Sequence, residues 1–423
     1  MIKPGDKLLI KTDDGEFEGI LMQRPEIVPG NALILKLDSG YNIGIAKNKI
    51  KSIKLLKAAE KTVQKKAGIR EKSGLPKVVI LSTGGTISSK VDYKTGGVSA
   101  ALSAEDFVLN VPEILEYANI EARQISQIMS EDMTSKTWAN IAKEIEKEIK
   151  KGAHGVIVTH GTDTMHYTSA AISFMLQNLP VPVIVVGSQR SVDRGSSDAY
   201  PNLLSAVIAA AKWDGAECVV CMHQSTNDDI NILVRGTKVR KMHTERRDAF
   251  RPINDLPLVK IDYHGNIARN IDYRTRSGAK LLVNTKFDDK VAIVYFYPGM
   301  DPQIIENLIK QRYHGIVIAG TGLGHVSQKL LSVLKKCYKT KIPVVMTSQC
   351  LYGRVHPYVY SRLREISMDT NVIYGEDMTP ETAYIKLMYV LGQTKDMDKV
   401  KELMTTNMVG EITKTTSPLS FLI

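Results

Sequence analysis

Long hydrophobic runs are missing from this 423-residue sequence. No stretch approaches the roughly 18 consecutive apolar residues that a membrane-spanning helix needs. The first seven residues include Pro4, Gly5 and three charged side chains, so they lack the apolar core of a secretory signal. We therefore expect no membrane contact and a cytoplasmic location.

Cysteine is scarce, with four residues in the whole chain. So few thiols in a chain of this length do not form a disulfide framework. Cys218 and Cys221 make a C-x-x-C pattern inside an apolar run, and His223 follows closely. Because side chains alternate between the faces of a strand, and no second ligand pair appears elsewhere, buried thiols are favoured over a metal site. We predict no metal in this chain.

Acidic residues are outnumbered by basic ones, 45 against 56, which gives a formal net charge of +11. A surplus of this size fits an acidic partner such as a nucleic acid. The lysines are spread along the chain, so a solvated basic surface is the alternative interpretation. Charge alone does not decide between the two.

Several well-known catalytic motifs are also absent. The glycines at 84 and 85 lack the Walker spacing, and His325 stands where G-x-G-x-x-G would need its last glycine. Ser188 does not sit in a G-x-S-x-G elbow, and H-E-x-x-H does not occur. The sequence therefore disfavours phosphate cradling and the usual serine and zinc hydrolases.

The domain organisation follows from a change in pattern along the chain. Short strands with tight turns come first and indicate a small β-barrel, with strands expected at 7–12, 16–23, 25–31, 32–37 and 42–47. From Lys77 onward, strands and helices alternate, which is typical of a doubly wound parallel sheet. We predict a small β-barrel adaptor domain at 1–57, a linker at 58–76, a large α/β domain at 77–272, a linker at 273–288 and a smaller C-terminal α/β domain at 289–423.

Two loops of similar composition each follow a predicted strand of the large domain. Thr83-Gly84-Gly85-Thr86-Ile87 follows an apolar run at 78–81, and His160-Gly161-Thr162-Asp163-Thr164 follows another at 155–159. In parallel α/β sheets, ligands bind beyond the carboxyl ends of the strands. Glycine allows a tight turn that leaves hydroxyl and backbone N–H groups open to a ligand. The two loops therefore predict one site.

The residue types in these loops suit a hydroxyl nucleophile. A threonine is a weak nucleophile until a neighbour takes its proton, and a carboxylate with an amine can serve that purpose. Asp163 directly follows Thr162. A lysine beside this carboxylate could orient it as a cation, or act as a base if burial removes its proton. Both Lys238 and Lys241, in the polar stretch 236–244, are candidates.

The paired loops resemble the signatures of the L-asparaginase family, TGGTI at 83–87 and HGTDT at 160–164. Further stretches at 130–133, 187–207 and 241–250 are similar to that family, and the resemblance covers 77–423. It implies an asparaginase-like fold, with a large parallel-sheet domain and a smaller α/β domain. It also favours Lys241 over Lys238.

The same resemblance implies a role for each matching residue. Thr86 would attack the side-chain amide of the substrate, with Tyr93 hydrogen-bonded to it. Thr162, Asp163 and Lys241 would handle the proton. The substrate-binding residues would be Ser130, Glu131, Gly85 and Gly161, although Glu131 departs from the glutamine that is frequent at this position in asparaginases.

The N-terminal barrel is foreign to stand-alone asparaginases. Together with the segment 241–250, it makes the whole chain similar to the D-subunit family of archaeal glutamyl-tRNA(Gln) amidotransferases. That resemblance implies a glutaminase that supplies ammonia to an E subunit, which converts Glu-tRNA(Gln) to Gln-tRNA(Gln). The E subunit would use ATP and Mg²⁺ and bind the tRNA, and this chain would hold no cofactor. A homodimer within a heterotetramer is expected. The alternative is a stand-alone cytoplasmic L-asparaginase.

Overall fold

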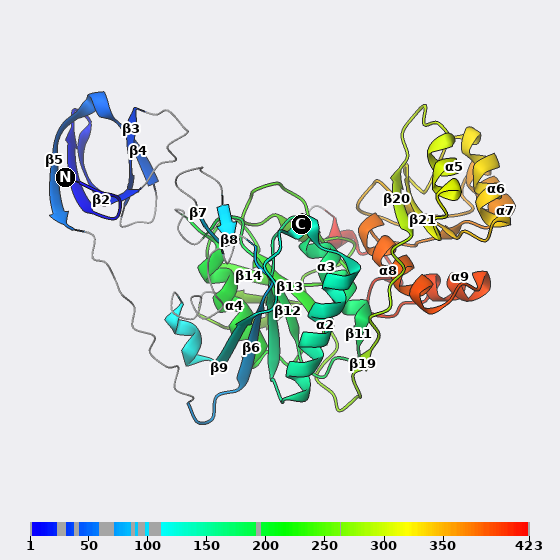
Figure 1. Cartoon of the computed structure of the whole chain (residues 1–423), viewed down its shortest axis with the longest axis horizontal. Coiled ribbons are helices and arrows are strands. Elements are labelled where there is room, and N and C mark those ends of the chain that lie inside the picture. Colours follow the sequence, from blue (N-terminus) through cyan, green and yellow to red (C-terminus); the bar gives the residue numbers. More distant parts are fainter. Residues whose placement is uncertain are drawn as a thin grey trace.

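The large domain is built on an eight-stranded sheet in the order β18-β17-β14-β13-β12-β10-β6-β9 (Figure 1). The computed structural model describes residues 2–22, 31–37, 42–58, 72–85, 89–91, 98–100, 111–191, 196–262 and 264–421. The sheet strands are β6 (Lys77–Ser82), β9 (Asn119–Gln124), β10 (Gly155–Thr159), β12 (Val183–Val186), β13 (Cys218–His223), β14 (Ile230–Arg235), β17 (Val259–Asp262) and β18 (Ile267–Arg269).

Five neighbouring strands of this sheet, from β9 to β13, are parallel. The parallel sheet predicted for the large domain is thus present, and the strands β14, β17 and β18 extend it at one edge in antiparallel fashion. The parallel part carries both Gly-containing loops at its carboxyl edge, because β6 and β10 are hydrogen-bonded neighbours.

Helices cover both faces of the sheet. The helices α2 (Ser135–Lys150) and α3 (Met165–Met175) pack on one face, and α4 (Ala199–Lys212) packs on the other. Alternate residues of each central strand enter the two cores, as Val156 and Ile157 of β10 illustrate. Thr134 begins α2 by accepting the backbone N–H of Thr137, and Gly152 follows its end with a φ of 86°.

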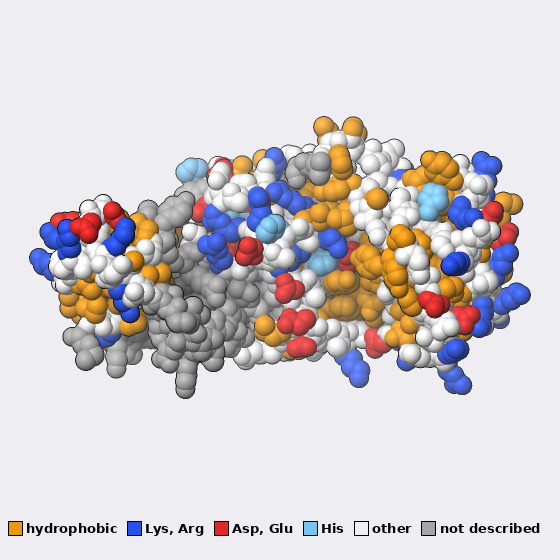
Figure 2. Space-filling model, turned by 90° about the horizontal axis from the view of Figure 1, so that it is seen from above, with side chains coloured by type: hydrophobic (Ala, Val, Ile, Leu, Met, Phe, Trp, Pro, Cys, Tyr) orange, Lys and Arg blue, Asp and Glu red, His pale blue; other side chains and the backbone are white. Residues whose placement is uncertain are grey.

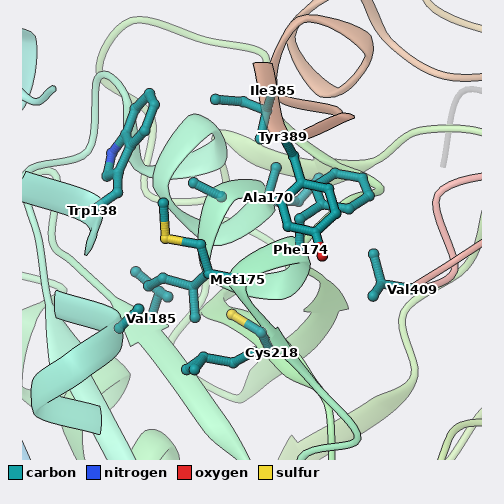
Figure 3. Packing of buried hydrophobic residues seen from close by; sticks show 14 of the residues in the cluster. Trp138, Ala170, Phe174, Met175, Val185, Cys218, Ile385, Tyr389 and Val409 are labelled. Carbon is teal, nitrogen blue, oxygen red and sulfur yellow. The ribbon is translucent and has the colours of Figure 1, made fainter. Parts of the chain in front are cut away.

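The smaller domain has a four-stranded parallel sheet in the order β20-β21-β22-β23. Its core on one face is closed by α5, α6 and α7, whereas α8 packs on the other face and also against α3. Figure 3 shows this shared core, where Tyr389 of α8 stacks on Phe174 of α3 with ring centroids 5.8 Å apart. The elements are β20 (Val291–Tyr295), α5 (Gln303–Lys310), β21 (Gly315–Gly320), α6 (Leu331–Lys339), β22 (Val344–Ser348), α7 (Ser361–Thr370), β23 (Ile373–Tyr374), α8 (Pro380–Gln393) and α9 (Met397–Thr405).

Five antiparallel strands make up the N-terminal part, in the order β4-β3-β2-β1-β5. They are β1 (Lys7–Thr12), β2 (Gly15–Met22), β3 (Ala32–Lys36), β4 (Asn42–Ala46) and β5 (Ile50–Lys57). The strand predicted at 25–31 lies almost entirely outside the described residues, and β5 was not predicted. No pairing between β4 and β5 occurs among the described residues, so the closed barrel stays a prediction.

Short elements complete the described chain. The strand pairs are β7 (Ser89–Val91) with β8 (Val98–Ala100), β11 (Leu176–Gln177) with β19 (Leu282–Val283), and β15 (Val239–Lys241) with β16 (Phe250–Pro252). The 3₁₀ turns are at Lys47–Lys49, Pro112–Glu116, Ser130–Asp132, Gln328–Leu330 and Pro418–Ser420. No helix in the described ranges is both long and apolar enough to cross a membrane.

The cysteines of the C-x-x-C pattern lie on opposite faces of β13. The Cys218 side chain enters the core under α3, whereas Cys221 enters the core under α4. Burial raises the pKa of both thiols to about 12. Two thiols on opposite faces cannot bind one metal ion, and the described residues contain no group of three His, Cys, Asp or Glu side chains that could hold one.

Thiol labelling of the native protein should therefore find one fast-reacting group. Cys218, Cys221 and Cys337 are buried and Cys350 is exposed, and only the accessible thiolate reacts with a disulfide reagent. We expect one equivalent to react rapidly under native conditions and four in denaturant. Cys350→Ser should remove the fast equivalent, and any fast-reacting thiol left in that variant would contradict the burial described here.

Candidate active site

The first Gly-containing loop leaves β6 in a conformation that requires glycine. Thr83 donates its backbone N–H and its hydroxyl to the carbonyl oxygen of Thr159, at 3.2 and 2.8 Å. Gly84 and Gly85 then take φ angles of 106° and 86°. A Cβ atom at Gly85 would lie 2.3 Å from the backbone nitrogen of Gly161. The two loops therefore pack backbone against backbone, as the shared-site prediction requires. Thr86 and Tyr93 lie outside the described residues.

His160 anchors the second loop and does not face a ligand. Its ring is buried, and burial lowers its pKa to about 4, so the imidazole is neutral at physiological pH. Nδ1 lies 2.6 Å from the Gly161 carbonyl oxygen, and Nε2 lies 2.8 Å from the Thr168 hydroxyl. Trp138 donates its indole N–H to the same hydroxyl. This arrangement indicates that Nδ1 carries the proton and Nε2 accepts one.

The structure brings Thr162, Asp163 and Lys241 together. Lys241 ends β15, and its Nζ donates to the Thr162 hydroxyl at 2.9 Å and to Oδ1 of Asp163 at 2.7 Å. The lysine side chain is 10% exposed, whereas that of Asp163 is 70% exposed. The amine therefore connects an almost buried hydroxyl to a carboxylate that remains accessible to a ligand.

Lys238, the other candidate lysine, forms an ion pair with a residue outside the set of Thr162 and Asp163. Its Nζ donates to Oδ2 of Asp377 at 2.7 Å, and both side chains are almost completely buried. Burial lowers the pKa of Lys238, and the Asp377 carboxylate opposes that shift. Asp377 belongs to the segment between β23 and α8, so this ion pair joins the smaller domain to the chain that leads into β15.

Lys238→Met should lower stability without changing catalysis. The substitution leaves the buried Asp377 carboxylate without its cation, although Thr413 still donates to it. Breaking a buried ion pair from one side typically costs about 3–5 kcal/mol. Urea denaturation should show this loss, whereas kcat of the folded variant should stay within about twofold of that of the unmodified chain. The double variant Lys238→Met/Asp377→Asn should regain part of the stability, and a failure to do so would contradict the charge argument.

Ser130 lies beside Gly161, although it belongs to a different segment of the chain. It begins a 3₁₀ turn at Ser130–Asp132, is buried, and accepts the Thr164 hydroxyl on its carbonyl oxygen at 2.5 Å. A Cβ atom at Gly161 would lie 2.8 Å from Cβ of Ser130. Glu131, by contrast, is exposed. The structure thus gathers Ser130, Gly85, Gly161, Thr162, Asp163 and Lys241. The described Glu131 side chain forms no hydrogen bond or ion pair with them.

One buried residue near this site was not predicted from the sequence. Asp198 is fully buried and accepts the backbone N–H groups of Gln189 and Arg190, each at about 3.0 Å. Burial raises its pKa, while these N–H groups act in the opposite direction. The signal in the sequence was weak, because an aspartate just before a helix normally indicates a helix cap.

Comparisons with known proteins agree with this geometry. Family models match residues 77–273 as "Asparaginase, N-terminal", 290–404 as "Glutaminase/Asparaginase C-terminal domain" and 2–56 as "GatD N-terminal domain". The L-asparaginase of Thermococcus kodakarensis has a similar structure, with a TM-score of 0.73 and 31% identity. The match covers 80% of this chain and all of that one.

Full-length relatives are more similar still. The D subunit of the glutamyl-tRNA(Gln) amidotransferase of Pyrococcus furiosus is 49% identical, over 100% of this chain and 98% of that protein. Its counterpart from Pyrococcus abyssi is 49% identical, over 97% of this chain and 95% of that protein. By these matches along its length, this chain belongs to the D-subunit family of glutamyl-tRNA(Gln) amidotransferases, and its residues 77–273 and 290–404 match the asparaginase family models.

Proposed function

We propose that this chain is the glutaminase subunit of a tRNA-dependent amidotransferase. It would hydrolyse glutamine and supply ammonia to an E subunit that converts Glu-tRNA(Gln) to Gln-tRNA(Gln). The observation that carries this proposal is the hydrogen-bonded set of Thr162, Asp163 and Lys241, at the strand ends where the two Gly loops meet, in a chain that also has a separate N-terminal domain.

The proposed chemistry begins with Thr86. Its hydroxyl oxygen attacks the side-chain carbonyl carbon of glutamine, and its proton passes toward the set formed by Thr162 and Lys241. The C–N bond then breaks, the –NH₂ group takes up this proton and leaves as ammonia, and a γ-glutamyl ester remains on Thr86. Water adds to this ester, which releases glutamate and restores the hydroxyl. Tyr93 would assist at Thr86.

Binding of the substrate follows from the chemistry of the remaining residues. Ser130 would hold the α-carboxylate, and the exposed carboxylate of Asp163 would attract the α-ammonium group. Backbone N–H groups of the loops that contain Gly85 and Gly161 would bind the oxyanion, a contribution of roughly 3 kcal/mol per donor in comparable sites. Glu131 would contact the substrate only if its exposed side chain turned inward.

The proposed partners explain features outside the site. ATP and Mg²⁺ would act on the E subunit, which would also make most contacts with tRNA(Gln), and the complex would be a heterotetramer around a homodimer of this chain. Figure 2 shows a group of Lys and Arg side chains left of the middle of the face seen from above, and others spread over both ends. Such a surface suits an assembly that contains tRNA. A role in translation also suits a cytoplasmic location.

A stand-alone L-asparaginase is the alternative, and the similar structure from Thermococcus kodakarensis supports it for part of the chain. That protein is matched in full by 80% of this chain, so the N-terminal domain is an addition that asparagine hydrolysis does not explain. The amidotransferase role therefore explains more of the chain.

Ammonia release distinguishes the two functions. It should be measured with glutamine and with asparagine, for the chain alone and with a candidate E subunit and Glu-tRNA(Gln). Acceleration of glutamine hydrolysis by the partner and tRNA would support the amidotransferase role. Rapid asparagine hydrolysis at a rate that the partner does not change would support the alternative. Thr86→Ala should remove the activity in either case, and retained activity would contradict the role assigned to Thr86.

A further inference from the structure

The loop from Gly187 to Ser191 lies against the proposed proton-handling set. A Cβ atom at Gly187 would lie 3.1 Å from Cγ2 of Thr162 and 2.8 Å from the His160 carbonyl oxygen. Two residues further on, the Gln189 side chain accepts a long hydrogen bond of 3.4 Å from the Thr162 hydroxyl. The loop therefore forms one wall around Thr162.

The contact with Gln189 determines where the Thr162 proton points. Lys241 donates to the Thr162 oxygen, so the threonine must send its own hydrogen toward another acceptor. Oε1 of Gln189 is that acceptor. The hydroxyl is thus oriented from both sides, by the Lys241 donor and the Gln189 acceptor.

The buried carboxylate of Asp198 holds this loop in place. Its two carboxylate oxygens accept the Gln189 N–H at 3.0 and 2.9 Å, the Arg190 N–H at 3.0 Å and the Asn202 side-chain amide at 3.0 Å. Asn202 also donates to the Gly187 carbonyl oxygen at 3.0 Å. Three residues of the loop are therefore tied to one buried pair, Asp198 with Asn202.

A role as a helix cap does not account for this carboxylate. Asp198 stands at the N-cap of α4, where an aspartate usually accepts an N–H group from the first turn. Here it makes no capping hydrogen bond with its side chain. Its oxygens point instead to the backbone of Gln189 and Arg190, so the fold uses a buried charge to fix the loop beside Thr162.

The pair is supported from the opposite side by a polar network. Oδ1 of Asn202 lies 2.6 Å from Nδ1 of His223 and accepts the Asn231 amide at 2.7 Å. Nε2 of His223 lies 3.0 Å from Asp228, which in turn pairs with Arg247 between β15 and β16. The network returns to the hairpin that carries Lys241. Arg247 lies six residues after Lys241, so the network that starts at Asp198 reaches the segment joining β15 to β16.

We propose that Asp198 is a positioning residue for glutamine hydrolysis, and that it acts through Gln189 on the Thr162 hydroxyl. This inference rests on the proposed function, because it concerns the rate of that reaction. Asp198 touches no reacting atom. It holds the acceptor that orients Thr162, so its loss should lower kcat more than it raises KM for glutamine.

Two variants test the inference in the full chain, assembled with whichever partner gives the unmodified chain its activity. Asp198→Asn turns an amide N–H₂ group toward donors on Gln189 or Asn202, and Gln189→Met removes the acceptor while keeping a side chain of similar length. A displacement of about 1 Å at a reacting group can cost about a hundredfold in rate. We expect Asp198→Asn to lower kcat by about that factor, Gln189→Met by about tenfold, and both to change KM by less than about threefold.

The control is Asp255→Asn, which alters another largely buried carboxylate. Asp255 pairs with Arg235 at the opposite end of β14 from Asn231, away from the site. This variant should lower the melting temperature and leave kcat unchanged. The double variant Asp198→Asn/Asn202→Asp exchanges donor and acceptor within the pair, and should recover part of the kcat lost in Asp198→Asn.

The outcomes separate this inference from the proposed function. If the unmodified chain hydrolyses no glutamine in any assembly, the proposed function fails. If it does so and Gln189→Met keeps kcat within twofold, the positioning role is overturned, whether or not Asp198→Asn folds. Equal loss of kcat in Asp255→Asn and Asp198→Asn would also overturn it, because general destabilisation would then explain both.

Discussion

Lys241→Met is expected to slow glutamine hydrolysis by roughly a thousandfold, because general acid–base groups contribute about 10²–10⁴ to catalysis. Methionine keeps the length of the side chain and removes the amine that contacts both the Thr162 hydroxyl and the Asp163 carboxylate. Steady-state ammonia release should show the loss mainly in kcat. Lys310→Met, at an exposed helix position, is the matched control and should behave like the unmodified chain.

A double-variant experiment shows whether these residues act together. Thr162→Val removes the hydroxyl with little change of shape and should also slow the reaction by orders of magnitude. If Thr162 and Lys241 handle one proton, the double variant should be hardly slower than the worse single variant, because groups that act as a unit are strongly non-additive. Multiplication of the two losses would show that they act independently, and the proposed set would be wrong.

Gly85→Ala is expected to abolish ammonia release and to destabilise the large domain. The new methyl group would lie 2.3 Å from the Gly161 nitrogen and 2.6 Å from the His160 carbonyl carbon, so one of the two loops must move. The φ of 86° adds a penalty of about 1 kcal/mol for any residue with a Cβ atom. Overpacking typically adds about 1–3 kcal/mol. Urea denaturation and ammonia release measure the two effects.

Gly74→Ala is the matched control for this prediction. Gly74 has a φ of 87°, and a Cβ atom there would have no neighbour within 4 Å. It therefore reports the conformational penalty alone, and activity should be unchanged. The difference between the two variants measures the cost of separating the loops. Equal effects at both positions would show that the close approach of Gly85 to Gly161 is unimportant.

Local patterns predicted the parts of the site that depend on neighbours in sequence. The loops at 83–87 and 160–164 were recognisable because each combines a buried strand with glycine and hydroxyl residues. The choice between Lys238 and Lys241 could not be made from composition, because only two residues lie between them. One lysine nevertheless forms a buried ion pair with Asp377, and the other contacts Thr162. Only the path of β15 and the position of the smaller domain decide it.

The features that were not predicted from the sequence leave no clear pattern among neighbouring residues. Strand β5 is exposed along nearly its whole length, so it lacks the alternation of buried and exposed residues that predicts a strand. The antiparallel strand β14 has a buried apolar centre like the parallel strands, and strand direction leaves no mark on composition. Asp198 was missed because its role depends on backbone groups nine and eight residues away in sequence.

The packing of helix α8 limits how glutamine can enter the candidate active site. Its apolar side chains fill one continuous core with α3 and with the sheet of the smaller domain, and the buried pair Lys238 with Asp377 joins the same two domains. Swinging the domains apart would expose that core to water and break a charged contact at once. Opening by a hinge between the two domains is therefore costly, and we expect substrate to enter without a change in their relative position.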